Sequence, residues 1–584
     1  MLRRLLVTSL VLLPALIATA HAAEPAGPPA RWIPSDAIFT VEISQPKAVL
    51  DLALDARITR LVTSLPAYQA ALNQEGAQGL LKLVEFLENR FNTDRKTLLT
   101  KLVGDGITIA VGAHGETVLI IDGQDAELLQ QVADIITGIA KDQAAKQGQS
   151  AEVESTEYAG VTVWKSGNKE SHAIVGKRLL VSNRSDVLKA VLDLRNGSPA
   201  QSLAGTPAYQ AAKKAVGDDA QAMAFVNMAV LKKAPKIQKA LADISSPLPV
   251  LTLAGMTEAL RQSHWLALKL RISGEQISLE TRMDGKSSES SLIASFSQPS
   301  RSRDGVFPNL DVPQRIAAVS LYRDVYKFYA AKDQLFRERT SGLIFFENMM
   351  GIFFSGRNLT EEVLSQLHPE IRVVVAQQKY DSARGTPTVQ VPSFAAVMRL
   401  RHPQEFGEVV EEAFQKAIGL VTVSSGQRGV PGMIIDRPTY HDVHYTVAYF
   451  GAAAADARDR REARYQYRPS LVKVGEYLVL SSSESLAHDL IDTLKREMAE
   501  PVKPLGGVHS LVELDSVQLI AIADANRKTL VRQNMAKNGI SEVEAAAKYD
   551  LYTPLIKRLG QATLRIGTQD GQVQARLQLK LNLQ

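Results

Sequence analysis

Two distant stretches of the chain share one pattern of apolar and polar positions. His172 to Leu194 and Ser470 to Thr493 each contain a short apolar run, a glycine turn, a second apolar run and serines ahead of an amphipathic segment. This pattern predicts a β-hairpin with a tight turn, followed by a capped helix. In the second copy, Ser481 and Glu484 have the spacing of a capping box. The chain is therefore predicted to contain two copies of one structural unit.

Strands and helices recur in a similar order around both copies. In the first strand, Ile38 to Ile43, the apolar residues Phe39, Val41 and Ile43 alternate with the rest. Further strands and helices are predicted in pairs, first half and then second half: strands 107–111 and 371–375, strands 118–121 and 394–400, helices 126–139 and 403–418, strands 161–164 and 443–450, strands 223–226 and 519–523, and hairpins 265–283 and 563–581. Strands outnumber the crossovers of a parallel sheet, so we predict an α+β fold with mostly antiparallel sheets and packed helices.

A repeat of this length indicates two tandem, internally repeated domains rather than a solenoid. The predicted division is 1–22 signal peptide, 23–33 proline-rich spacer, 34–298 first repeat domain, 299–312 linker and 313–584 second repeat domain. Ala452 to Arg468 has no counterpart in the first half, and its role is left open. Whether the sheets of the two repeats merge is also open.

The N-terminus has the pattern of a secretory signal peptide. Arg3 and Arg4 precede an apolar run from Leu5 to Ala18, and Ala20-His21-Ala22 has the small residues of a cleavage site. The apolar run is shorter than the ~20 residues of a membrane-spanning helix, so we expect cleavage after Ala22 and no transmembrane segment in the mature chain. An uncleaved anchor is the alternative. The protein is thus predicted to be exported, to the periplasm or the extracellular space.

The amino-acid composition excludes several kinds of site and partner. The 584 residues are 45% hydrophobic and include no cysteine, which excludes disulfides and thiolate metal sites. The formal charge of +5 is small for this length, and no nucleic-acid partner is expected.

A resemblance rests on the entry Trp32-Ile33-Pro34-Ser35-Asp36-Ala37 into the first strand, the duplicated hairpin-plus-helix and the signal peptide. Together they resemble large exported bacterial proteins of unknown function with a duplicated α+β domain. The resemblance implies no activity and brings no site residues.

His441-Asp442-Val443-His444 has the spacing most like that of a metal site. On a strand, however, residues three apart point to opposite faces, so the two imidazoles are not expected to share an ion. No serine elbow or phosphate-binding glycine loop is present. We therefore predict no catalytic residue, metal or cofactor. His402, His441 and His444 are the first side chains to inspect for a site assembled from distant residues.

One stretch is unusually apolar. Read as a helix, Leu343 to Phe354, LIFFENMMGIFF, has apolar groups on nearly every side, so it must be covered by protein, ligand or lipid. Burial as an internal helix is one reading of the stretch, and a binding face is the other. The candidate apolar contact residues are Leu343, Phe345, Phe346, Met349, Met350, Phe353 and Phe354.

These observations favour an exported, non-enzymatic binding or scaffolding protein of the bacterial cell envelope, with an unidentified envelope component as partner. One alternative is a carrier of an apolar ligand or lipid that uses Leu343 to Phe354. The other is an envelope hydrolase whose site is assembled from distant residues.

Overall fold

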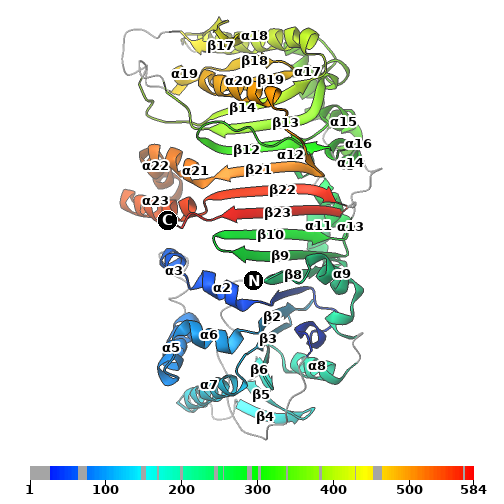
Figure 1. Ribbon diagram of the computed structural model, residues 1–584, viewed down its shortest axis with the longest axis vertical. Coiled ribbons are helices and arrows are strands. Elements are labelled where there is room, and N and C mark those ends of the chain that lie inside the picture. The colour runs from blue at the N-terminus through cyan, green and yellow to red at the C-terminus, as the bar shows by residue number, and fades with distance from the viewer. Residues whose placement is uncertain are drawn as a thin grey trace. The chain divides into compact units, whose positions relative to one another are not determined.

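The computed structural model describes residues 27–63, 75–146, 153–166, 170–197, 201–242, 247–253, 255–285, 292–299, 304–336, 340–380, 385–427, 429, 431–451, 463–569 and 572–583. The predicted signal peptide and residues 452–462 of the second-half insert lie outside these described residues. The chain divides into two compact units. Figure 1 labels the helices and strands of each. Unit 1 comprises Met1–Ala240 and Gln262–Gly285, and unit 2 comprises Leu241–Arg261 and Lys286–Asn582. Residues 241–261 therefore belong to unit 2, although the sequence places them in the first repeat.

Unit 1 is built around antiparallel strands. Its strands are β1 (Phe39–Ile43), β2 (Gly106–Val111), β3 (Thr117–Asp122), β4 (Val153–Tyr158), β5 (Val161–Ser166), β6 (Glu170–Val175), β7 (Arg178–Ser182), β8 (Ala222–Asn227), β9 (Trp265–Ser273) and β10 (Gln276–Met283). Its helices are η1 (Pro29–Trp32), α2 (Pro46–Ala53), α3 (Ala56–Thr63), α5 (Glu75–Arg90), α6 (Arg95–Val103), α7 (Ala126–Lys146), α8 (Ser185–Asn196), η3 (Leu203–Gly205) and α9 (Pro207–Val216). The chain between β8 and β9 carries α10 (Met228–Leu231), α11 (Pro235–Ala242), α12 (Pro247–Leu253) and α13 (Gly255–Gln262).

Unit 2 has the same kind of construction. Its strands are β11 (Gly305–Val306), β12 (Arg315–Tyr322), β13 (Leu367–Ala376), β14 (Ser393–Leu400), β15 (Met433–Asp436), β16 (Thr439–Tyr440), β17 (Val443–Phe450), β18 (Ser470–Val474), β19 (Tyr477–Ser481), β20 (Leu505–Gly506), β21 (Val508–Asp515), β22 (Gln561–Gln569) and β23 (Gln572–Lys580). Its helices are α14 (Leu292–Ser297), α15 (Val325–Ala330), α16 (Lys332–Leu335), α17 (Thr340–Phe353), η4 (Leu359–Val363), η5 (Leu364–Gln366), α18 (Pro403–Gln427), α19 (Ala463–Gln466), α20 (Glu484–Ala499), α21 (Ser516–Ala525), α22 (Arg527–Asn538) and α23 (Glu542–Arg558).

The main strands of the two units lie in the same relative order in their sheets. In unit 1 neighbouring strands run β4-β5-β6-β7-β3-β2-β1-β8-β9-β10. In unit 2 they run β15-β17-β18-β19-β14-β13-β12-β21-β22-β23. Each of these pairs is antiparallel, so the predicted α+β class with mostly antiparallel sheets is confirmed.

The two glycine turns of the sequence pattern are hairpin turns of one kind. Val175 pairs with Arg178, and Val474 pairs with Tyr477, which leaves two residues in each turn. The first of these is a glycine with positive φ in both cases, 60° in unit 1 and 57° in unit 2. Positive φ at the first position alone is the geometry of a type II′ turn, which favours glycine there.

Two details of the prediction are wrong. Leu519–Ala523 is not a strand but part of α21, because an apolar run of this length suits a buried helix as well as a strand. The side chain of Asp515 accepts hydrogen bonds from the backbone N–H groups of Val517 and Gln518 and so starts the helix. The second correction concerns α20, whose N-cap is Ser483 rather than Ser481.

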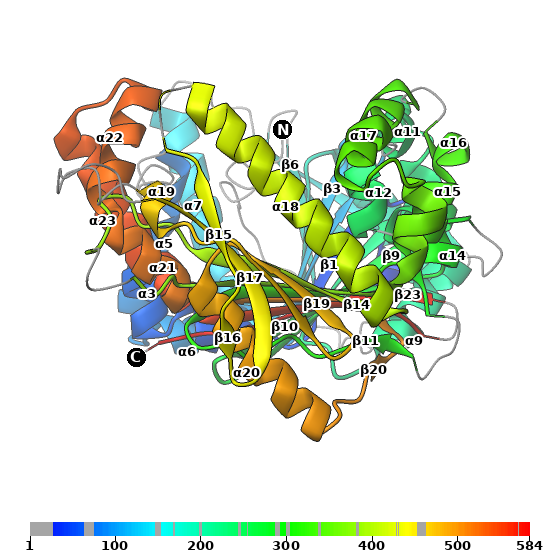
Figure 2. The same ribbon diagram turned by 90° about the horizontal axis from the view of Figure 1, so that it is seen from above.

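One face of each sheet is closed by helices. In unit 1, α8 and α9 pack on this face, with Leu188, Leu192 and Ala212 against Ile120 and Phe225. In unit 2, α20 packs on the corresponding face, and Figure 2 shows α20 on one side of β14 and β19 and α18 on the other. We call the face covered by α8 and α9, or by α20, the closed face of each sheet. The opposite side is the open face.

Candidate functional site: an aliphatic open face on each sheet

The open face of unit 2 carries a straight row of aliphatic side chains. Seven neighbouring strands each place one residue opposite the next: Leu577, Leu564, Val512, Val319, Val373, Ala396 and Leu480. The first six are half-buried, and Leu480 is 44% exposed. We call this set the long row. Six strand spacings of ~4.8 Å make it about 29 Å long.

A second apolar row runs beside the first. It consists of Leu579, Ala562, Leu514, Ala317, Val375 and Phe394. Leu514 and Phe394 are exposed, and the other four are half-buried. We call this set the short row. Since its residues lie two positions along each strand from those of the long row, the two rows are roughly 6.7 Å apart.

The open face of unit 1 has an equivalent row. It contains Thr281, Leu268, Ala224, Val41, Ile109, Leu119 and Val181, one from each of seven neighbouring strands. All seven are half-buried, and six are aliphatic. The two units therefore present the same chemistry at positions that correspond in strand order.

On strand β1 the distribution of polar residues is inverted relative to an ordinary half-exposed sheet. An antiparallel sheet usually places its apolar face on the core and its polar face in water. In β1, by contrast, Thr40 and Glu42 are buried while Phe39 is 37% exposed and Val41 is half-buried. Glu42 accepts a hydrogen bond from Tyr209 and pairs with Lys213, 3.0 Å away. These α9 partners explain why the charged side chain lies on the closed face.

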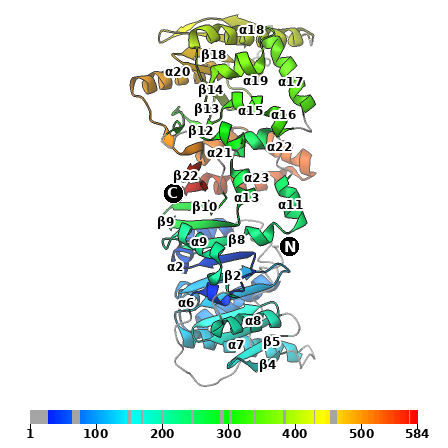
Figure 3. The ribbon, with the colours of Figure 1, turned by 90° about the vertical axis from the view of Figure 1, so that its right-hand side faces the viewer.

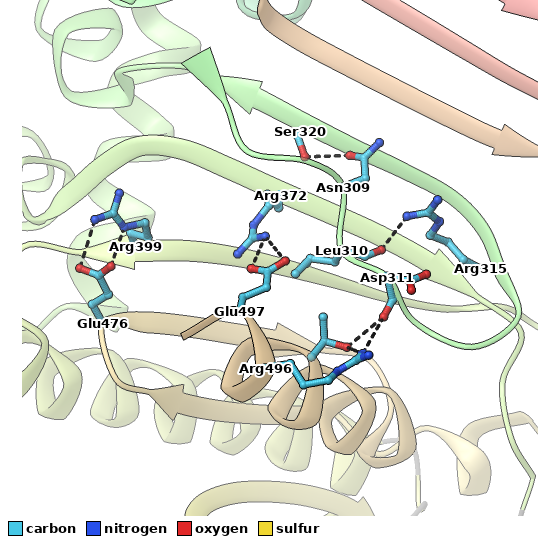
Figure 4. A network of polar contacts seen from close by, with 11 residues as sticks. Asn309, Leu310, Asp311, Arg315, Ser320, Arg372, Arg399, Glu476, Arg496 and Glu497 are labelled. Carbon is cyan, nitrogen blue, oxygen red and sulfur yellow. Dashed lines mark hydrogen bonds and ion pairs between the residues drawn. The ribbon is translucent and has the colours of Figure 1, made fainter. Parts of the chain in front are cut away.

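The closed face of unit 2 has a similar internal polar network, which Figure 4 shows. Arg372 is 3% exposed, pairs with Glu497 of α20 at 2.7 Å, and lies over the rings of Phe307 and Tyr477. The arm that precedes β12 is held between the sheet and α20 by backbone contacts. Thr493 Oγ1 donates to the carbonyl of Asp311 at 3.0 Å. The closed face is therefore occupied by the chain's own groups. On the open face α18 packs over Leu471 and Leu478 of β18 and β19, and the strands beyond it are the part considered for another molecule.

Helices flank the open face of unit 2 at the strand ends. Figures 1 and 2 agree in showing α22 and α23 on one side of the strands and α15 to α17 on the other. Within the described part of unit 2, no helix makes more than marginal contact with β22 or β23. On β22 and β23 the residues of the closed face are polar, among them Arg565 and Arg576. On the middle strands the open-face residues Val319, Val373 and Val512 are half-buried rather than fully buried.

The apolar stretch predicted as a contact site is only half internal. Figure 3 shows α17 beside α15, α16 and α18. Leu343, Met350 and Phe354 pack against the core between α18 and the sheet, and Phe353 is half-buried. The other side is open, with exposed fractions of 71% for Phe345, 40% for Phe346 and 38% for Met349. Complete burial as an internal helix, the first reading of the sequence, is therefore not found.

The histidines chosen for inspection are not brought together into a site. His441 lies in a turn, not on a strand, with φ of 48°, because it and Asp442 form the two-residue connection between Tyr440 and Val443. Its Nδ1 is 2.8 Å from Asp492, whereas His444 Nδ1 is 2.8 Å from Thr439 Oγ1. His402 Nδ1 is 2.8 Å from Gln366 Oε1. Of these contacts, only that of His444 pairs a histidine with a hydroxyl, that of Thr439.

Two hollows in the described part of unit 2 are lined mainly by polar residues. One, of about 300 Å³, is lined by residues that include Asp311, Arg315 and Glu513. The other, of about 360 Å³, lies beside the start of α20 and includes Arg468 and Glu484, which pair with each other at 2.6 Å. In the described residues no three His, Asp or Glu side chains are grouped as metal ligands.

No helix among the described residues is long and apolar enough to cross a membrane.

Sequence analysis did not identify the open faces. The signal was present in β22 and β23, where apolar and polar residues alternate from Gln561 to Ile566 and again from Gln572 to Lys580. Alternation shows which side chains share a face. It does not show whether another element covers that face.

Comparison with known proteins gives no family. No family model matches the chain, and no curated protein matches it. Among solved structures, crystal forms III, I and IV of TP0453 align with TM-scores of 0.25, 0.24 and 0.23 and sequence identities of 12%, 11% and 13%. Each alignment covers 45% of this chain and 81% of the other. A likeness at these TM-scores supports no conclusion about fold or function.

Proposed function

We propose that this chain is an exported, non-enzymatic binding protein of the cell envelope, built from two repeats, whose open sheet faces hold apolar groups. The observation that carries the proposal is the long row of unit 2, seven apolar side chains on one face, of which six are half-buried and Leu480 is 44% exposed. Aliphatic surface of this extent is unfavourable in water, at about 25 cal/mol per Å². A bound apolar group removes that cost.

Two further observations support it. The same row recurs in unit 1, although the closed faces of the two units differ, with Glu42 buried in one and Arg372 in the other. The shared strand order is the arrangement expected of a tandem repeat. The N-terminal pattern of basic residues, an apolar run and small residues supports export. Of the functions that the sequence left open, apolar-ligand binding fits these features better than a hydrolase.

A pair of adjacent substitutions on β22 tests the binding face. Leu564 is on the long row and Thr563 is on the closed face, and both are half-buried. Leu564→Asp is expected to weaken binding of the uncharged dye N-phenyl-1-naphthylamine by about tenfold, because a carboxylate in the contact must lose water without gaining a partner. Thr563→Asp should change the affinity less than about twofold. The readout is a fluorescence titration of each folded variant.

Equal loss of dye binding in both variants, or no loss in either, would place the apolar site elsewhere. A loss confined to variants of Phe345 or Phe346 would move it to α17.

A further inference from the structure

We propose that the occupant of the open face of unit 2 is a diacyl lipid, with its two acyl chains lying across the strands along the long row and the short row. This inference rests on the proposed function and specifies the ligand class. Neither row contains a charged residue. A complementary ligand is therefore uncharged along its whole contact, as hydrocarbon is.

The backbone of the open face offers no hydrogen bonds. The central strands β12, β13, β14, β21 and β22 each pair with a strand on both sides. An extended peptide could therefore not add to the sheet here, because strand addition requires a free edge. An acyl chain needs no hydrogen bond, so this surface loses nothing in binding one.

The dimensions of the rows suit two chains. Acyl chains span about 15 Å each, half of the ~30 Å hydrocarbon core of a bilayer, so a row of about 29 Å can carry at least one. The two rows are roughly 6.7 Å apart, which allows two chains to lie side by side. Since the described open-face residues of the middle strands keep part of their surface in water, a headgroup can remain in water as well.

The experiment uses the mature full-length protein and phosphatidylcholine vesicles in which one acyl chain carries a diazirine. After irradiation, mass spectrometry locates the crosslinks. We expect them on peptides that contain Val319, Val373 and Leu564, and a yield at least about tenfold lower in Leu564→Asp but not in Thr563→Asp. In a second arm, soluble short-chain phosphatidylcholines should bind about fourfold more tightly for each methylene that becomes buried.

The other outcomes overturn the lipid assignment in distinct ways. Crosslinking by a diazirine fatty acid but not by the phospholipid would make the ligand a single-chain acid. If neither lipid crosslinks, or if affinity is independent of chain length, while N-phenyl-1-naphthylamine binding still depends on Leu564, the occupant is an apolar protein segment and the proposed binding face stands. If the dye also fails to bind, the proposed function itself is contradicted.

Discussion

Replacement of Arg323 by alanine is expected to lower the free energy of unfolding of unit 2 by roughly 3–5 kcal/mol. Arg323 is 0% exposed, and this burial away from water lowers the pKa of its guanidinium to about 10. Its guanidinium donates to one hydroxyl and four carbonyls: Ser510 Oγ at 2.8 Å and the carbonyls of Leu251 at 2.5 Å, Thr252 at 3.0 Å, Tyr322 at 2.6 Å and His509 at 2.9 Å.

The cost arises because alanine leaves these buried acceptors without donors and opens a cavity. Two of the carbonyls belong to α12, in the segment Leu241–Arg261 that the chain inserts between β8 and β9. Arg323 therefore holds this segment to β12 and β21. Lysine is not expected to substitute, since its ammonium cannot reproduce the planar fork of donors.

The effect can be assigned to unit 2 because all three tryptophans, Trp32, Trp164 and Trp265, lie in unit 1. Urea unfolding followed by far-UV circular dichroism reports both units, and tryptophan fluorescence reports unit 1. The matched control is Arg527→Ala, which removes an exposed pair with Asp550 and should change the stability little. If the two variants are equally stable, Arg323 does not anchor the segment.

Acidification from pH 7 to pH 5 is expected to destabilise unit 2 by roughly 2 kcal/mol through His509 alone. Burial, with Arg323 nearby, lowers the pKa of His509 from 6.5 to about 3. In the unfolded chain the His509 imidazole therefore takes up a proton near pH 6.5, whereas in the folded chain it stays neutral at that pH. Stability is complete above pH 6.5 and falls as the pH decreases toward 3. Burial likewise lowers the pKa of His172 in unit 1, to about 4, so both units should lose stability in this range.

The measurement is the unfolding free energy at pH 7.5, 6 and 5 for the natural protein and for His509→Gln, which cannot titrate. The variant should start lower at pH 7.5 but lose about 2 kcal/mol less between pH 7.5 and 5 in the transition assigned to unit 2. His172→Gln serves as the control, because it should flatten only the transition seen by tryptophan fluorescence. Parallel pH curves for all three proteins would contradict buried neutral histidines.

The sequence predicts most of the strands because their apolar runs are long and end in turn residues. Gly106–Val111 and Thr117–Asp122 are examples, found within a residue or two of the expected bounds. The error at Leu519–Ala523 has the opposite cause. A run of five apolar residues is compatible with a strand or a helix, and the N-cap hydrogen bonds of Asp515 favour the helix.

The candidate site could be predicted only in part. The alternation in β1 shows that Phe39, Val41 and Ile43 share a face opposite Glu42, but it suggests that the apolar side is buried. The structure reverses this because Tyr209 and Lys213, more than 160 residues away in sequence, provide partners for Glu42. Such pairings depend on tertiary structure, which local patterns do not report. The composition of Leu343–Phe354 predicts that these apolar side chains contact other apolar groups. It does not predict which side of the helix is covered.

The central claim is that apolar ligands bind on the open face of unit 2, and its most direct test is a pair of fluorescent labels on neighbouring residues. Because the natural chain has no cysteine, Leu564→Cys and Thr563→Cys each give one attachment site for an environment-sensitive naphthalene dye. On addition of phosphatidylcholine vesicles, the label at residue 564 should shift to the blue, since bound hydrocarbon excludes water there, and the label at residue 563 should not. A shift at residue 563 alone, or equal shifts at both, would contradict the account.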